Sequence, residues 1–250
     1  SIYFNEKVFL RKHYDINYLY TLCSDKSKVR EYIKFRIGDE YLIPLILDTD
    51  KPEEVIELRN LERAVIKLNT GAGMNVIQPN IKNTAKKIEL LELMKNWMVT
   101  DYSALHNEPH YKKINKRIVV EESICIGDKV PTDYKFHCFK QKDDTVQFVL
   151  QFVNGRFHNE SRGYFKNDLD ICVHSHGAGH HKIPENDKLA LKEIIRLNQI
   201  LAQDFNYVRI DWFVSNGQPY FGELTFTPGG GLSAEFGEEL EKYMCEMWVL

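Results

Sequence analysis

The chain has 250 residues, of which 43% are hydrophobic and 28% charged, a composition typical of a globular protein with a core sufficient for one large domain or two lobes. Its formal net charge of −3 argues against a nucleic-acid partner, and no apolar run approaches the length of a membrane span. The five cysteines form no CxxC pair and the first residues do not resemble a signal peptide, so we expect a cytoplasmic protein with free thiols.

The first half of the chain alternates predicted helices with short predicted strands. Apolar stripes at helical spacing predict helices, over residues 25–36, 53–58 and 83–99. Apolar runs between turn residues predict strands, over residues 41–47, 64–68, 75–78 and 117–121. Asp25 is placed to cap the first helix, and Pro44 within the first strand predicts that this strand lies at a sheet edge.

The second half is richer in predicted strands and contains two amphipathic helices. The strands are expected over residues 134–140, 145–153, 157–165, 168–173, 207–214 and 219–226. The helices are expected over residues 189–203 and 234–248. Turns join most neighbouring strands directly, which predicts antiparallel sheets and the α+β fold class. A hinge near residues 122–129 would divide the chain into two lobes.

The last predicted hairpin carries two carboxylates, Asp211 in its first strand and Glu223 in its second. Carboxylates amid apolar neighbours are costly to bury unless a charge compensates them, and a divalent cation is one such charge. A two-residue Asn216-Gly217 loop would place them on opposite faces, whereas a three-residue loop with Gly217 at positive φ would place them on one face. We predict the three-residue loop and a cation site, with an ordinary solvated hairpin as the alternative.

A lysine in an apolar strand precedes a glycine-containing turn: Lys67 is followed by Gly71-Ala72-Gly73. Backbone N–H groups in such a turn can cradle phosphate oxygens. The segment lacks the GxxxxGK[ST] of a P-loop and the third glycine of a dinucleotide-binding fingerprint, and a strand is expected to follow it. It therefore predicts a phosphate loop of another kind, with a plain tight turn beside a surface lysine as the alternative.

Alternation along the strand near residue 136 places Asp133, Lys135 and His137 on one face. On an internal strand this charged face suggests the wall of a cleft, while on an exposed sheet it would simply face solvent. Two further acids, Glu121 and Glu122, end the strand before the predicted hinge. They suggest contacts to ribose hydroxyls, beside hinge backbone that would pair with adenine; a solvated strand end is the alternative.

Closely spaced histidines occur between His174 and His181. Such spacing can chelate a metal, but the segment is rich in glycine, is predicted to be a loop and has no evident catalytic acid beside it. We therefore do not expect a metal site there.

Four segments resemble, in this order, the TupA-like proteins of the ATP-grasp superfamily: 25–33, 71–75, 133–136 and 223–229. That family is named for teichuronopeptide synthesis in bacterial surface-polysaccharide biosynthesis, and the similarity extends from about Asp25 to Gly231. It implies an ATP-grasp fold, in which two α+β lobes with mainly antiparallel sheets enclose an ATP cleft. Residues 1–24 would be an N-terminal extension, 25–122 the small lobe, and 123–250 the large lobe with the metal-binding hairpin.

The resemblance also implies a role for each matching residue. ATP would be bound by Lys28, Lys67, Gly71, Ala72, Gly73, Met74, Glu121, Glu122 and Lys135. One or two Mg²⁺ ions would be bound by Asp211, Glu223 and Thr225, with Glu223 bridging. Arg209 and Lys135 would act in catalysis, Arg209 by stabilising an acyl-phosphate or the oxyanion formed from it. The substrate would contact Arg209, Thr227, Gly229 and Gly230.

The implied activity is that of an ATP- and Mg²⁺-dependent carboxylate–amine ligase, which forms ADP and makes an amide through an acyl-phosphate. By resemblance, the acid is a uronic acid of a bacterial capsular or cell-wall polysaccharide or of its nucleotide-sugar precursor, and the amine is an amino acid or amino alcohol. The rivals are an ATP-dependent sugar or small-molecule kinase and a non-catalytic nucleotide-binding module.

Two features depart from the family's pattern. Thr225 stands where many ATP-grasp ligases carry Asn, and a hydroxyl is a weaker neutral ligand for a metal. Only some two dozen residues precede Asp25, too few for a separate N-terminal substrate domain. Acceptor binding would therefore come from the two lobes, from a partner domain or protein, or from a part of the protein outside this sequence.

Overall fold

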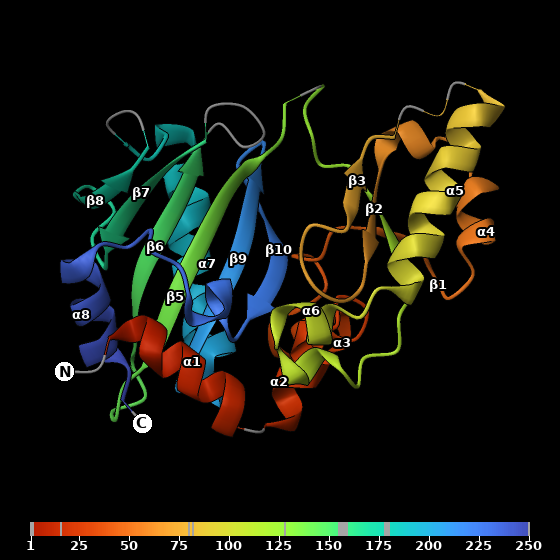
Figure 1. Cartoon of the computed structure of the whole chain (residues 1–250). Helices are drawn as coiled ribbons and strands as arrows, with labels where there is room; N and C mark the ends of the chain where they lie inside the picture. The colour runs from red at the N-terminus through yellow and green to blue at the C-terminus, as the bar shows by residue number, and fades with distance from the viewer. Residues whose placement is uncertain are drawn as a thin grey trace. The chain divides into compact units, whose positions relative to one another are not determined.

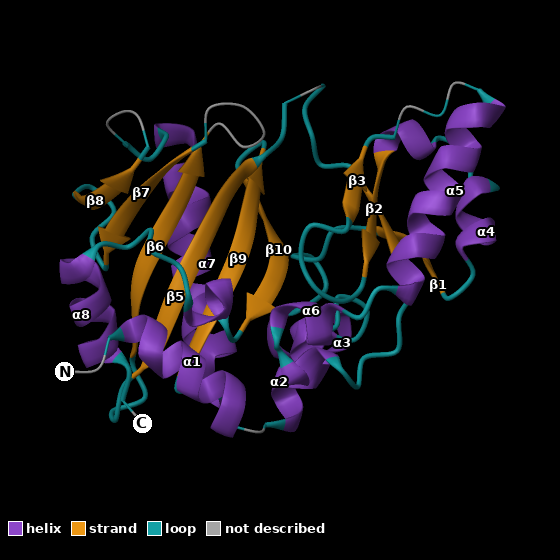
Figure 2. Ribbon diagram, viewed as in Figure 1, coloured by secondary structure: helices purple, strands orange, loops and turns teal. Residues whose placement is uncertain are grey.

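The computed structural model describes residues 3–15, 17–79, 81, 83–127, 129–154, 160–177 and 181–249. It contains two antiparallel sheets with their own helices, which confirms the predicted α+β class (Figure 2). A large unit comprises Ser1–Asp15, Ile33–Tyr41 and Cys125–Leu250, and a small unit comprises Ile16–Tyr32 and Leu42–Ile124. One of the four passages between the units, at Ile124–Cys125, lies within the range predicted as a hinge. Ser1–Asp15, expected in the N-terminal extension, and Ile33–Tyr41, expected in the small lobe, are assigned to the large unit.

The small unit is built on a four-stranded sheet in the order β1-β4-β2-β3. Its strands are β1 (Leu45–Thr49), β2 (Ala64–Leu68), β3 (Asn75–Ile77) and β4 (Ile118–Glu122). Its helices include α2 (Tyr18–Ser24), α4 (Pro52–Ile56), α5 (Thr84–Val99) and α6 (Tyr102–His106), with short 3₁₀ turns at Leu61–Arg63 and Pro109–Tyr111. α5 contributes Leu90, Met94 and Trp97 to a core shared with apolar residues of β2 and β4. β1 lies at the sheet edge as predicted, although Pro44 precedes the strand instead of lying within it.

The predicted helix at Asp25 begins later than expected. Residues 26–28 form a turn, and α3 covers Val29–Ile37. The Asp25 carboxylate accepts the backbone N–H of Ser27 at 2.9 Å, so it caps this turn as an Asx motif does and leaves the helix to start four residues further on.

The large unit contains a six-stranded sheet in the order β10-β9-β5-β6-β7-β8. The strands are β5 (Thr132–Lys140), β6 (Val146–Asn154), β7 (Ser161–Lys166), β8 (Cys172–His176), β9 (Tyr207–Ser215) and β10 (Gln218–Thr225). α1 (Phe4–Tyr14) and α8 (Glu238–Met247) lie on one face of this sheet, and α7 (Lys188–Leu201) lies on the other (Figure 1). Three 3₁₀ turns complete the unit, at Glu185–Asp187, Ala202–Asp204 and Pro228–Gly231. Part of the strand predicted over 157–165 lies outside the described residues.

The predicted alternation along β5 is confirmed, and the strand is internal, between β9 and β6. Phe4 of α1 packs edge-on against His137, with ring centroids 5.8 Å apart. On the opposite face, Trp212 of β9 donates to Asn198 of α7 at 2.9 Å. Helices therefore cover both faces of the sheet, and the charged residues of β5 share their face with the part that α1 covers.

The three-residue hairpin loop predicted between β9 and β10 is wrong. Ser215 pairs with Gln218, so the loop is the two-residue Asn216-Gly217, with φ of 52° and 74°. A β-bulge between Phe221 and Glu223 then shifts the register by one residue and sets Glu223 directly opposite Asp211. The two carboxylates share a face as expected, but the bulge is what aligns them. Gly222 occupies the bulge because a Cβ there would lie 2.9 Å from the Asp211 carbonyl oxygen.

Candidate functional site

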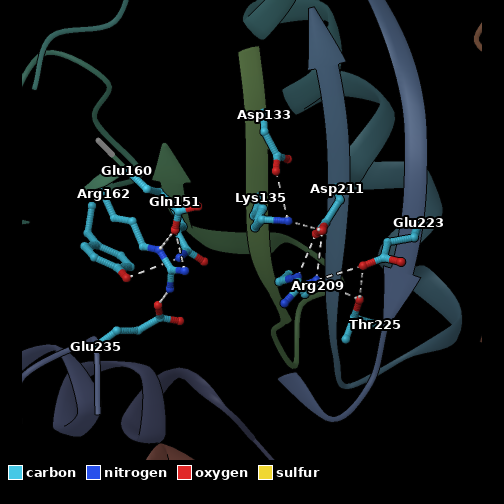
Figure 3. Close-up of polar contacts among 11 residues, drawn as sticks. Asp133, Lys135, Gln151, Glu160, Arg162, Arg209, Asp211, Glu223, Thr225 and Glu235 are labelled. Carbon is cyan, nitrogen blue, oxygen red and sulfur yellow. Dashed lines mark hydrogen bonds and ion pairs between the residues drawn. The ribbon is translucent and has the colours of Figure 1, made fainter. Parts of the chain in front are cut away.

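Charged side chains gather on the three neighbouring strands β10, β9 and β5 of the large unit (Figure 3). We call the following set the hairpin cluster: Asp133, Lys135, Arg209, Asp211, Glu223 and Thr225. Lys135 pairs across the sheet with Asp211, and Asp211 pairs with Glu223. Side chains at paired positions point to the same face, so this row follows from strand register alone.

Asp211 is the centre of the hairpin cluster and is only 2% exposed. Arg209 donates to both of its carboxylate oxygens, from Nε at 2.7 Å and from Nη2 at 2.8 Å. Lys135 Nζ lies 2.7 Å from Asp211 Oδ2 and 3.1 Å from Asp133 Oδ2. These contacts with two cations, together with burial, hold the Asp211 carboxylate in one side-chain conformation.

One nitrogen of Arg209 marks where three oxygens of the hairpin cluster converge. Nη2 lies 2.8 Å from Asp211 Oδ2, 3.0 Å from Glu223 Oε1 and 3.0 Å from the Thr225 hydroxyl, which donates to Glu223 at 3.2 Å. Two carboxylates and a hydroxyl around one positively charged atom form a set of hard oxygen donors, the type that Mg²⁺ prefers. These residues therefore fit a magnesium ion if the Arg209 guanidinium moves away from the three oxygens that it contacts.

The electrostatics favour the charged forms of Asp211, Lys135 and Arg209. Burial favours a neutral Asp211 carboxyl, but the charges of Arg209 and Lys135 outweigh it and hold the pKa of that carboxyl well below its usual range. Burial likewise disfavours the Lys135 ammonium, yet Asp133 and Asp211 raise its pKa. The Arg209 pKa is also raised, because Asp211 and Glu223 outweigh its burial. Two cations against three carboxylates leave one excess negative charge, which an added cation would neutralise.

A smaller charged group lies in the small unit, and we call Arg30, Lys67 and Glu121 the Glu121 cluster. Glu121 on β4 is 7% exposed and accepts from Lys67 Nζ at 2.5 Å and from Arg30 Nη1 at 2.7 Å. Sequence reasoning placed Lys67 and Glu121 in a nucleotide site but did not predict this ion pair, and it missed Arg30. Two cations share one carboxylate, so the Glu121 cluster carries one excess positive charge. Glu122, the other predicted ribose contact, is exposed at the strand end.

The predicted phosphate loop connects β2 to β3, as expected for a loop followed by a strand. Gly71 and Gly73 have φ of 74° and 79°, a region that favours glycine, and a Cβ on Gly73 would meet no atom within 4 Å. Lys26 holds the Gly71 carbonyl at 2.5 Å. The loop is therefore held at Gly71 by Lys26, while the space beside Gly73 is open. The Met74 carbonyl closes it onto β2 by accepting from the Leu68 N–H at 2.9 Å.

A buried asparagine ties the turn that carries Lys28 to this loop. Asn69 is fully buried, and its Nδ2 donates to Asp25 Oδ1 at 2.8 Å, while its carbonyl accepts from the Lys26 N–H at 2.9 Å. The structure thus brings the Lys28 turn beside the loop, although the Lys28 side chain is exposed. No pattern in the sequence pointed to Asn69, because its role depends on a partner 44 residues away.

The remaining predicted substrate residues form the 3₁₀ turn directly after the hairpin cluster. Thr227 is 3% exposed, and Gly229, Gly230 and Gly231 have φ of 59°, 60° and 77°. Three successive residues in the left-handed region explain the glycine run, since other L-residues adopt that region at a cost. We call Pro228–Gly231 the glycine turn.

Other features considered in the sequence are the histidine-rich segment and the cysteines. Within the described ranges, no group of three or more His, Cys, Asp and Glu side chains could hold a metal ion. His174 bonds through Nε2 to the Glu235 carbonyl at 3.2 Å, and His180 lies outside the described residues. All five cysteines are free, as predicted. No helix in the described part of the chain is long and apolar enough to cross a membrane.

The sequence matches the TupA-like ATP-grasp family over residues 6–249, so this chain belongs to that family. No curated protein matches it by sequence. The D-alanine–D-alanine ligase of Helicobacter pylori has a similar structure, with a TM-score of 0.55 at 15% identity over 92% of this chain and 62% of that one. The L-amino acid ligase of Bacillus licheniformis gives a TM-score of 0.54 at 12% identity over 91% of this chain and 49% of that one.

The fold is therefore the ATP-grasp fold, and the chain spans about half to three-fifths of the two ligases it resembles.

Proposed function

We propose that this chain is an ATP- and Mg²⁺-dependent ligase that joins a carboxylate to an amine through an acyl-phosphate. The observation that carries the proposal is the hairpin cluster, in which two cations, three carboxylates and a hydroxyl lie together on the strands of an ATP-grasp fold. A protein without turnover has no physical need for so many buried charges, since each is costly to desolvate.

A carboxylate resists nucleophilic attack because its own charge repels the nucleophile. Transfer of the γ-phosphoryl group of ATP to a carboxylate oxygen releases ADP and gives an acyl-phosphate. The amine nitrogen then attacks the carbonyl carbon, phosphate leaves with the C–O bonding electrons, and the nitrogen gives up a proton. A protein assists these steps mainly by positioning and by stabilising charge.

The residues of the hairpin cluster have distinct parts in this scheme. Arg209 donates N–H groups toward the phosphoryl group or the oxyanion that forms at the carbonyl carbon. Lys135, fixed by Asp133 and Asp211, carries the positive charge that a phosphate needs. Asp211, Glu223 and Thr225 would hold Mg²⁺, which when bound supplies charge neutralisation at the phosphate oxygens.

The small unit supplies the groups proposed for nucleotide binding. The excess positive charge of the Glu121 cluster, together with the Lys28 side chain and the open space beside Gly73, suits the phosphates of ATP. Glu121 is held by two cations, so Glu122 is the freer of the two acids proposed for the ribose.

The substrate proposal is more specific. The acid would be a uronic acid, free, nucleotide-linked or polymeric, and the amine an amino acid or an amino alcohol. Membership of the TupA-like family supports this choice, since that family is named for a peptide-bearing surface polysaccharide.

The testing experiment measures ADP release with MgATP, a panel of uronic acids including nucleotide-linked ones, and a panel of amines, with Glu223→Ala as the blank. Release that requires both an acid and an amine supports the ligase. Release that requires only a sugar and leaves a stable phosphorylated product would make the protein a kinase. A protein that binds no MgATP would have no ATP-dependent activity, and the proposal would be wrong.

A further inference from the structure

The N-terminal helix α1 packs directly on the glycine turn. Asn5, Phe9 and Lys12, spaced i, i+4 and i+7, form one stripe of the helix. A Cβ on Gly231 would lie 2.7 Å from the Asn5 carbonyl oxygen and 2.8 Å from the Phe9 nitrogen, so backbone meets backbone there. Asn5 Nδ2 also donates to the Ser233 carbonyl at 2.5 Å. A segment expected to be only an extension thus packs on the glycine turn, which follows the last strand of the hairpin cluster.

Lys12 is a buried cation in this contact, with only 9% of its surface exposed. Its ammonium donates to the Gly230 carbonyl at 3.1 Å and lies 5.4 Å from the Phe9 ring centroid. No carboxylate of the described residues pairs with it. An ammonium has three donors, and its burial without an anionic partner is unfavourable. The described surroundings of the Lys12 ammonium therefore lack an anion that would balance its charge.

The neighbouring basic residues of α1 each have more polar partners among the described residues than Lys12 has. Arg11 donates to the Tyr207 carbonyl at 2.7 Å, pairs with Asp15 at 3.3 Å and lies 4.4 Å from the Trp248 ring. Lys7 donates to two carbonyls, of Cys245 at 2.9 Å and of Trp248 at 2.7 Å. Lys12 contacts one carbonyl, of Gly230, and one aromatic ring, of Phe9. The glycines of the turn beside it have no side chains that could bind a ligand.

We propose that Lys12 binds a substrate carboxylate at the glycine turn, and that the amine substrate is consequently an amino acid and not an amino alcohol. This inference rests on the proposed ligase activity. A free or nucleotide-linked uronic acid has one carboxylate, and that group reacts at the hairpin cluster, so with such an acid the carboxylate left for Lys12 belongs to the amine substrate. Gly230 follows Thr225 by five residues, which limits the separation of their Cα atoms to roughly 17 Å.

A binding experiment tests the inference without turnover. The thermal midpoint of the wild-type chain, of Lys12→Met and of Lys7→Met is measured with MgATP and, in turn, each L- and D-amino acid or the amino alcohol of the same carbon skeleton. We expect at least one amino acid, but not its alcohol, to raise the midpoint of the wild type and of Lys7→Met, and to leave that of Lys12→Met unchanged. Equal stabilisation of Lys12→Met, or none of the wild type, would overturn the assignment.

Steady-state kinetics then separate this inference from the proposed function. Lys12→Met should raise the KM for the amino acid about tenfold to a hundredfold, because a charge-assisted hydrogen bond is lost, while the KM values for ATP and the acid stay within about twofold. Lys12→Arg should restore part of the loss. A rise in the KM for the acid alone would overturn the assignment to the amine. Amino-acid binding that needs Lys12 but yields no amide would refute the ligase and leave the carboxylate site standing.

Discussion

The hairpin cluster and the Glu121 cluster both bury a carboxylate between two cations, yet they carry opposite excess charge. In the large unit, Asp211 is joined by two further carboxylates, of which Glu223 keeps 32% of its side chain exposed. In the small unit, Glu121 alone serves both Lys67 and Arg30. The first arrangement suits the metal cation that we propose there, and the second suits the phosphates that we propose for the small unit. Both clusters contain a buried carboxylate, so burial does not distinguish them. They differ in the number of carboxylates that accompany the two cations, three in the hairpin cluster and one in the Glu121 cluster.

The largest effect is expected from Asp211→Ala. Removing this carboxylate leaves Arg209 and Lys135 buried without their main partner, which costs roughly 3–5 kcal/mol of unfolding free energy. Amide-forming turnover should fall by at least about a thousandfold, as the metal ligand and the positioned cations are lost together. Urea unfolding followed by tryptophan fluorescence, with ADP release on the same samples, measures both. A variant as stable as the wild type would show that Asp211 does not organise the cluster.

Glu223→Gln separates the chemistry from the stability. The side chain is half-exposed, so we expect the unfolding free energy to change by less than about 1 kcal/mol. Turnover should still fall by roughly a hundredfold or more, because an amide is a poorer Mg²⁺ ligand than a carboxylate. A Mg²⁺ titration of ADP release should show a higher half-saturating concentration. Unchanged turnover and Mg²⁺ dependence would exclude Glu223 as a metal ligand.

Lys67→Met tests the excess positive charge of the small unit. Loss of this ammonium leaves Glu121 with Arg30 alone and removes the charge proposed for phosphate, so ATP affinity should fall about tenfold. Calorimetry with MgATP gives the affinity. Lys95→Met is the matched control, since Lys95 pairs with an exposed Glu53 at 2.7 Å in the same unit. Equal affinities in the two variants would move the phosphate site elsewhere.

The smallest effect at neutral pH, and a growing one in acid, concerns His137 beside the hairpin cluster. Its burial, aided by the charge of Arg209, lowers its pKa to about 3. The unfolded chain binds a proton near pH 6.5 while the folded chain does not, so this contribution to stability is complete above about pH 6.5 and is lost as the pH falls toward 3. Urea midpoints of His137→Phe should therefore decline less steeply in acid than those of the wild type.

The exposed His176 supplies a control for that titration. His176→Gln is the control variant. A His137→Phe curve parallel to that of the wild type would mean that His137 titrates normally in the folded protein.

Local patterns predicted the elements well. The period-2 alternation of Asp133, Lys135 and His137, and the strands before and after the Gly71 turn, depend only on a residue's immediate neighbours and were confirmed. The start of α3 was wrong because the side chain of Asp25 satisfies a turn as readily as a helix end. The predicted hairpin loop was wrong because no pattern in the sequence indicated the β-bulge. The two-residue loop alone would place Asp211 and Glu223 on opposite faces, and the bulge, ten or more residues from Asp211 along the chain, shifts the register so that they share a face.

The sequence by itself determined most of the strands, their faces and the family, since these reside in short spacings and in the order of motifs, whereas α1, α2 and α6 were not predicted. The tertiary structure decided which charges meet. Arg30 contacts Glu121 across 91 residues, Lys135 contacts Asp211 across 76, and Lys12 contacts Gly230 across 218. A contact between distant residues depends on how sheets and helices pack, and no periodicity within one segment encodes the partner it will find.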